Sequence, residues 1–231
     1  MFTIYINDLD VCADKLKISR RPSFPVPIRN YETYEIKGKS GSLYEDLNTY
    51  SDIEISIEFN YICNQEIWNE VFRECKKTFL NCGGKRLSFS DDETYYYKIK
   101  RAIMEENKRE SIVSGSFVVR FTLDPFSYLL HGLQKTKMLL FQNEYEVSFP
   151  TYFIKGEGMC SLNVNGNIMS ANVGQNLVID TYLQQSYKND GTSQNTNVLG
   201  NYHDLLLLEG TNRISITQGF SLSIMPNWRT L

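Results

Sequence analysis

The sequence predicts a mainly β protein of the β-rich α+β class, made of two folding units with one amphipathic helix in the first. Three observations predict this: alternation of apolar and polar residues, a single stretch of helical periodicity, and a change of composition near residue 130. A chain of 231 residues suits one large domain or two modest ones. Its hydrophobic content of 42% is enough to bury a core.

The change of composition divides the chain into residues 1–130 and 131–231. The first part carries 18 Lys and Arg and 20 Asp and Glu, whereas the second carries 6 and 7 and is rich in Asn, with 12. Two units with different surfaces explain this contrast better than one continuous core. Pro125 and Gly132 interrupt the pattern within residues 124–137, so we expect the joint there.

In the first unit, residues 53–61 alternate most clearly, with isoleucines and aromatics on one side and polar residues on the other. That period of two predicts a half-buried strand. Weaker alternation predicts strands at 2–6 and 31–36, followed by a loop at 38–42. Further strands are expected at 86–90, 95–105 and 116–124, which gives a sandwich-like or barrel-like domain.

Residues 65–80 change to helical periodicity, with Trp68, Val71 and Cys75 among the apolar residues on one face. Asn64 is a plausible N-cap, and Gly83-Gly84 supplies a stop. We expect this helix to cover one side of the sheet.

The second unit reads as a run of short strands, typical of a β-sandwich. Asn165-Gly166 predicts a type I′ hairpin turn, because both residues tolerate positive φ. The expected strands are residues 159–164, 167–171, 177–180, 205–208, 213–217 and 221–225.

No residue pattern supports catalysis, a metal ion or a cofactor. His131 and His203 have no cysteine pair at zinc spacing, and Asp91-Asp92-Glu93 reads as an acidic turn more readily than as a cation site. The five cysteines are an odd number without framework spacing, which favours reduced core thiols. A cysteine-dependent enzyme using Cys75 stays open, because its partner could meet it in space.

Charge and hydropathy exclude several classes. A net charge of −3 with both signs dispersed argues against a dedicated nucleic-acid binder. No apolar run approaches the ~20 residues that span a bilayer, so we expect no membrane insertion. The first residues do not resemble a signal peptide, so we expect synthesis and folding in the cytosol.

The succession of motifs resembles the distal tail proteins of siphophages over nearly the whole chain. In the first unit the matching pieces are residues 41–47, the strand at 52–61, the helix, the stretches 85–90 and 95–103, and 117–126. In the second they are 150–156, 162–166, 178–180, 187–188, 209–214 and 226–229. Their order and spacing carry the resemblance.

The resemblance implies a structural protein of the phage tail tip, or baseplate, assembled in the bacterial host cytoplasm. Such proteins form a homo-hexameric ring through the N-terminal domain and carry a galectin-like C-terminal β-sandwich. The implied partners are the major tail tube protein, the tape-measure protein and the tail-associated fibre or lysin protein. DNA only passes through the lumen, which suits a slightly acidic chain.

The segment 37–50 is our candidate for the ring interface, with Tyr44 and Tyr50 as anchors; the alternative is an ordinary exposed connection. The alternative function is a carbohydrate-binding adhesin or receptor-binding module. In that case Tyr187 and Trp228 are the candidate contacts to a host-surface glycan.

Overall fold

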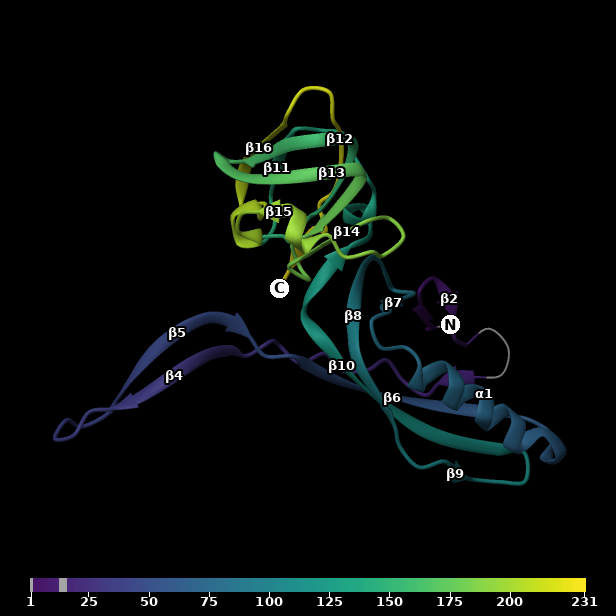
Figure 1. Ribbon diagram of the computed structural model, residues 1–231. Helices are drawn as coiled ribbons and strands as arrows, with labels where there is room; N and C mark the ends of the chain where they lie inside the picture. Colours follow the sequence, from purple (N-terminus) through teal and green to yellow (C-terminus); the bar gives the residue numbers. More distant parts are fainter. Residues whose placement is uncertain (1, 13–15) are drawn as a thin grey trace. The chain divides into compact units, whose positions relative to one another are not determined.

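The computed structural model describes residues 2–12 and 16–231, and these form a mainly β fold with one α-helix in the described part of the chain (Figure 1). The predicted fold class is therefore confirmed. Contacts divide the chain into two compact units: residues 1–127 with residue 231, and residues 128–230. No helix in the described ranges has the length and apolar character needed to cross a membrane.

The main sheet of the first unit has the strand order β2-β1-β7-β8-β10-β6-β3, and β9 pairs with β10. Its strands are β1 (Ile4–Ile6), β2 (Leu9–Asp10), β3 (Leu16–Ile18), β6 (Ile53–Ile62), β7 (Arg86–Phe89), β8 (Asp92–Met104), β9 (Lys108–Arg109) and β10 (Ser114–Leu129). Strands β6 and β10 pair antiparallel over the whole length of β6, from Ser114 opposite Ile62 to Leu123 opposite Ile53.

The core of the first unit lies between this sheet and α1 (Trp68–Leu80), which follows a 3-10 turn, η1 (Gln65–Ile67). Every second residue of β6 is buried, as the alternation predicted. Phe59 of β6 packs against Phe79 of α1 at 4.8 Å and against Phe117 of β10 at 5.4 Å between ring centroids. Asn64 precedes the 3-10 turn, but its side chain makes no capping hydrogen bond.

The segment after residue 42 differs from the prediction. Residues 38–42 turn the chain, but Ser42–Tyr50 forms a second strand, β5, which pairs only with β4 (Arg29–Glu35) among the described strands. Figure 1 shows these two strands as a hairpin with no third strand beside them. The predicted exposed segment at 37–50 is thus mostly regular β structure.

The second unit is a curled sheet of order β11-β16-β12-β13-β14, with β15 on β13 and β17 on β12. Its strands are β11 (Leu140–Asn143), β12 (Thr151–Val164), β13 (Asn167–Asp180), β14 (Gln185–Tyr187), β15 (Val198–Leu199), β16 (Gly210–Ile216) and β17 (Ser221–Met225). The last strand, β18 (Arg229–Thr230), is not part of this sheet and pairs with β10. Three 3-10 turns complete it: η2 (Leu130–Leu133), η3 (Asn195–Asn197) and η4 (Tyr202–Leu205).

Two predictions for this unit are corrected. The strands expected at 159–164, 167–171 and 177–180 belong to two long strands, β12 and β13, which pair from Thr151 opposite Asp180 to Val164 opposite Asn167. Residues 205–208 contain the end of η4 and an isolated bridge from Leu207 to Ser148, not a strand. The predicted turn is confirmed, with φ of 54° at Asn165 and 95° at Gly166.

Within residues 124–137, where we expect the joint between the two units, Pro125 does not end a strand. Strand β10 continues through this residue to Leu129, and η2, which contains Gly132, follows directly. The local geometry at Gly132 is tight, because a β-carbon there would lie 2.6 Å from the backbone nitrogen of Trp228.

Candidate assembly interface

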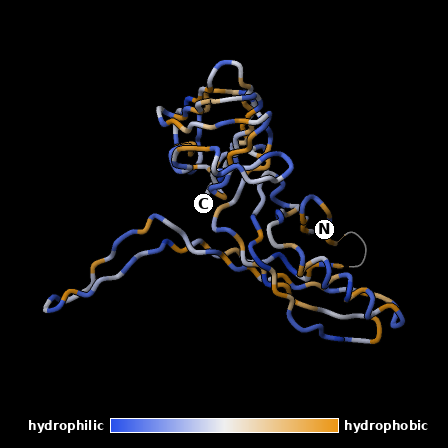
Figure 2. Tube along the Cα trace, in the orientation of Figure 1, coloured by the Kyte–Doolittle hydropathy of each residue, from blue (hydrophilic) through white to orange (hydrophobic). Residues whose placement is uncertain are grey.

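The β4–β5 hairpin carries large apolar side chains that stay about half exposed in the described chain. Tyr34 lies directly opposite Leu43, and Leu47 lies on the same side of β5 as Leu43 because they are four positions apart; Ile36 directly follows β4. We call these four residues the apolar face; each is 44–47% exposed. Apolar stretches lie on both strands of the hairpin in Figure 2.

Two acidic residues share that face. Glu32 and Glu45 lie opposite each other in the register. Hydrogen bonds from the Tyr34 hydroxyl to Glu32, and then to Glu45, raise the pKa of Tyr34. The hairpin therefore presents apolar side chains on both sides of an acidic pair, a mixture of apolar and hydrogen-bonding groups that also occurs in protein–protein contacts.

Tyr44 lies on the other side of the hairpin, opposite Thr33, and is 69% exposed. Tyr31 is exposed on the same side, opposite Asp46. A two-stranded hairpin is at best marginally stable alone in water, because it has no second layer to bury either side. Both sides of this hairpin are therefore available to another protein surface.

A tight set of polar contacts holds the root of the hairpin. The Arg29 guanidinium donates to Asp46, with Nε 2.9 Å from Oδ1 and a terminal nitrogen 2.6 Å from Oδ2. The backbone N–H of Asn48 donates to the same carboxylate at 2.9 Å, where Asn48 has a positive φ of 52°. The Asn48 contact, followed by that of Arg29, holds the pKa of Asp46 below its ordinary value.

Tyr50 belongs to this root and not to the free end. Its ring packs edge-on against Phe126 of β10 at 5.9 Å between centroids, and Arg29 lies over it at 6.0 Å. Of the two candidate anchors, Tyr44 is exposed on the hairpin, whereas Tyr50 packs against the main sheet of the same unit. The role of both residues in a ring interface stays a prediction.

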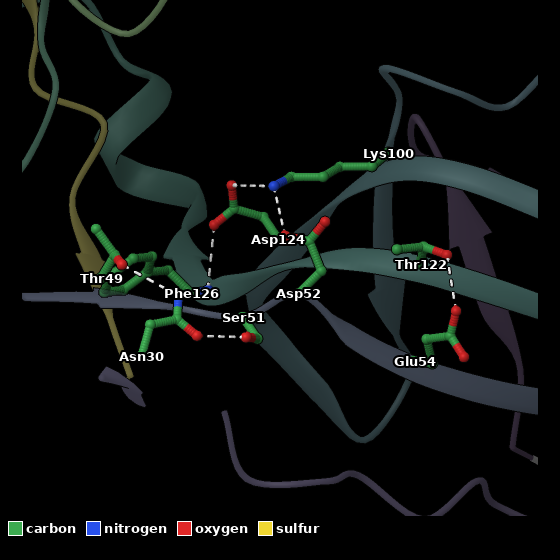
Figure 3. A network of polar contacts seen from close by, with 9 residues as sticks. All are labelled: Asn30, Thr49, Ser51, Asp52, Glu54, Lys100, Thr122, Asp124 and Phe126. Carbon is green, nitrogen blue, oxygen red and sulfur yellow. Dashed lines mark hydrogen bonds and ion pairs between the residues drawn. The ribbon is translucent and has the colours of Figure 1, made fainter. Parts of the chain in front are cut away.

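A second network fixes the chain where the hairpin meets the main sheet (Figure 3). Asn30 bonds to Ser51 at 2.6 Å and to Thr49 at 3.1 Å, so the two strands are tied at their base. Lys100 of β8 lies between Asp52 and Asp124, at 2.5 Å and 4.0 Å respectively. Asp124 in turn accepts the backbone N–H of Phe126 at 3.2 Å.

The other residues singled out from the sequence lie elsewhere. Trp228 is 8% exposed and packs against Phe141 at 5.9 Å and Tyr145 at 6.3 Å, so its indole presents no open face to a sugar. Tyr187 is half-buried, and burial followed by the nearby Asp180 carboxylate raises its pKa. Its role in sugar contact stays a prediction.

The structure also shows the surroundings of the five cysteines. All five cysteines are free, and Cys75 is buried on the core side of α1. Burial raises the pKa of the Cys82 and Cys160 thiols, which disfavours the reactive thiolate. Within the described ranges, no group of three or more His, Cys, Asp or Glu side chains is arranged to hold a metal ion.

Comparison with known proteins identifies the fold. The crystal structure of the SPP1 Dit protein (gp 19.1) superimposes on the chain with a TM-score of 0.68, at 12% sequence identity, covering 100% of both chains. The chain has the Dit fold. No protein-family model matches the sequence, and no curated protein matches it.

The SPP1 Dit protein is described as a paradigm of the hub of the adsorption apparatus in phages that infect Gram-positive bacteria. The likeness to the Dit fold extends over both units of the present chain. It thereby confirms, at the level of structure, the resemblance that the order of sequence motifs indicated.

Proposed function

We propose that this chain is a structural distal tail protein of a long-tailed phage or prophage, and that it works by assembly and not by catalysis. The observation that carries the proposal is the full-length likeness to the SPP1 Dit protein. Fold alone does not imply function, so the surface of this chain has to supply the rest of the argument.

The exposed side chains of the β4–β5 hairpin support a role in assembly. Tyr34, Leu43 and Leu47 are half-exposed apolar side chains on one side of a strand pair that lacks a second layer. Exposed apolar side chains that gather on one surface are typical of an interaction site. We infer that the hairpin packs on a second copy of the chain, and that successive copies close into a ring of six.

A closed ring needs two different complementary surfaces on each subunit, because its contacts are head-to-tail. The hairpin is one of them. For the other, exposed apolar residues lie at the far ends of the main-sheet strands, at Ile62 of β6 and at Ile112 and Val113 before β10. The backbone N–H of Cys63 bonds to the carbonyl of Val113 at 2.9 Å, so these residues form one local patch.

In this role the first unit forms the ring and the second, galectin-like unit is peripheral. The ring would join the tail tube and tape-measure protein to the tail-associated fibre or lysin protein at the tail tip. DNA would pass through the lumen without being gripped, which the net charge of −3 favours.

Negative-stain electron microscopy of the purified chain, combined with its mass in solution, tests the proposal. Rings with a mass near six times 26.8 kDa are the expected result. A two-fold dimer as the largest species would contradict head-to-tail closure. A chain that stays monomeric at the highest concentration reached would contradict self-assembly of the ring.

A further inference from the structure

Three lysines of the second unit line one cavity of about 330 Å³. These are Lys135 and Lys137, which precede β11, and Lys155 of β12. Ser221 and Ser223 of β17 and the ring of Phe153 complete the part of the lining that faces them. A cavity of this size is at the lower end of the range for small-molecule sites.

The fold brings these residues to one side of the sheet. Ile154 and Ile224 point into the core, at 1% and 0% exposure, so their neighbours along each strand point outward. Lys155 lies directly opposite Ser221, and Phe153 opposite Ser223. Thr136 pairs with Ile224 through backbone hydrogen bonds of 2.9 Å and 2.7 Å, which sets Lys135 and Lys137 beside Ser223.

The charge at this place is concentrated and uncompensated. Residues 131–231 contain 6 Lys and Arg in all, and three of them line the cavity. All three are exposed, and none forms an ion pair with a carboxylate of the described residues. Gathering like charges raises the local positive potential, which attracts anions.

The aromatic ring in the lining does not serve as a sugar platform. The Lys135 ammonium lies 3.5 Å from the centroid of the Phe153 ring, so it covers the face on which a sugar would stack. Such a cation–π contact instead holds the ammonium group in place over the cavity.

We propose that this cavity binds a phosphate group, either free or as part of a polyol phosphate. A phosphate monoester carries about −1.5 to −2 charge at neutral pH and three strong acceptor oxygens. Three ammonium groups and two hydroxyls are enough to neutralise that charge and to donate to all three oxygens. A carboxylate offers one charge and two oxygens and would leave donors unused. The proposal does not depend on assembly of the chain into a hexameric ring.

Calorimetric titration of the full chain at low salt tests the site, with inorganic phosphate, glycerol phosphate, acetate and galactose as probes. We expect phosphate or glycerol phosphate to bind, and Lys135→Gln and Lys155→Gln each to weaken binding about tenfold, since a charge-assisted hydrogen bond is lost. Arg213→Gln is the matched control, because it removes one exposed charge from β16 of the same unit outside the cavity. It should change binding less than twofold, a bound set by ordinary surface effects.

The results distinguish free phosphate from a polyol phosphate, and both from other ligands. Binding of glycerol phosphate in preference to inorganic phosphate supports a polyol-phosphate ligand, and the reverse preference supports free phosphate. Acetate binding as tightly as phosphate, galactose binding, an equal loss in Arg213→Gln, or no binding would each overturn the proposal. The amide NMR spectrum of each variant reports whether it is folded. Because the cavity lies outside the hairpin, failure here leaves the mass of the assembly unchanged.

Discussion

Lys100 and Asp52, 48 residues apart in the sequence, form an ion pair with 2.5 Å between Nζ and Oδ1. Asp52 separates the end of β5 from the start of β6, and Lys100 belongs to the central β8. Lys100 also lies 4.0 Å from Asp124, whose side chain is only 6% exposed. One ammonium group therefore joins the root of the hairpin to the main sheet and neutralises a buried carboxylate.

Replacing Lys100 by Met should destabilise the first unit, because it removes the ammonium group that lies between the carboxylates of Asp52 and Asp124. Removing one partner of a buried pair costs several kcal/mol, but Lys100 is 42% exposed and solvent screens part of the effect. We expect a loss of about 1–2 kcal/mol in the free energy of unfolding. Urea denaturation measures it. Lys17→Met, an exposed lysine of β3, is the control and should fall within about 0.5 kcal/mol of the wild type.

The root of the hairpin should loosen in acid. Because the backbone N–H of Asn48 and the Arg29 guanidinium hold the pKa of Asp46 below its ordinary value, the folded hairpin favours the carboxylate. Its contribution to stability is present above the ordinary pKa of 3.8 and is lost as the pH falls through the lower, folded value. The Asn48 amide resonance, followed by NMR, should shift over that acid range. In Asp46→Asn this acid transition should be absent; if it persists unchanged, another group controls the root.

Gly132→Ala should destabilise the second unit. The added β-carbon would lie 2.6 Å from the backbone nitrogen of Trp228, which is not a flexible side-chain end that can move aside. Overpacking of this kind costs about 1–3 kcal/mol, measurable by thermal or urea unfolding. Gly174→Ala is the control, because its β-carbon would meet Lys188 only at 3.7 Å. Equal effects of the two substitutions would refute this account of Gly132.

Sequence patterns identified the elements that bury one face. β6 was readable because its isoleucines and aromatics alternate with polar residues, and the Asn165-Gly166 turn because its backbone needs positive φ. The helix can also be predicted, because its buried residues Val71, Cys75 and Phe79 recur every four positions and so lie on one face.

The patterns failed where burial is not one-sided. β5 buries neither face, so its sequence lacks the contrast between apolar and polar positions and reads as a loop. β13 was divided because the exposed pair Gly174-Gln175 interrupts its apolar alternation; Gln175 has a φ of 73° and lies opposite Gly156 of β12. Trp228 could not be placed from sequence, because an aromatic residue near a terminus is equally compatible with packing and with recognition.

The same limit applies to the candidate interface. Tyr44 and Tyr50 are equivalent in the sequence as polar-loop aromatics, but only the fold distinguishes an exposed side chain on the hairpin from one that packs on Phe126. Likewise, the three lysines of the cavity are spread over residues 135–155, and only the pairing of β17 with β12 and with Thr136 brings them to the two serines.

The central claim is that the hairpin carries self-assembly, and the mass of the chain across a dilution series, by light scattering, tests it most directly. The variant is Leu43→Ser with Leu47→Ser, and the control is Leu9→Ser, which changes a leucine of β2 that is 73% exposed and lies outside the hairpin. Each leucine on the apolar face should contribute about 1 kcal/mol to a contact, or roughly fivefold in affinity, because about half of its surface is already covered. We predict that wild type and control form a species near six times 26.8 kDa and that the double variant dissociates at much higher concentration. A double variant that assembles as tightly as the wild type, with its fold intact, would contradict the claim.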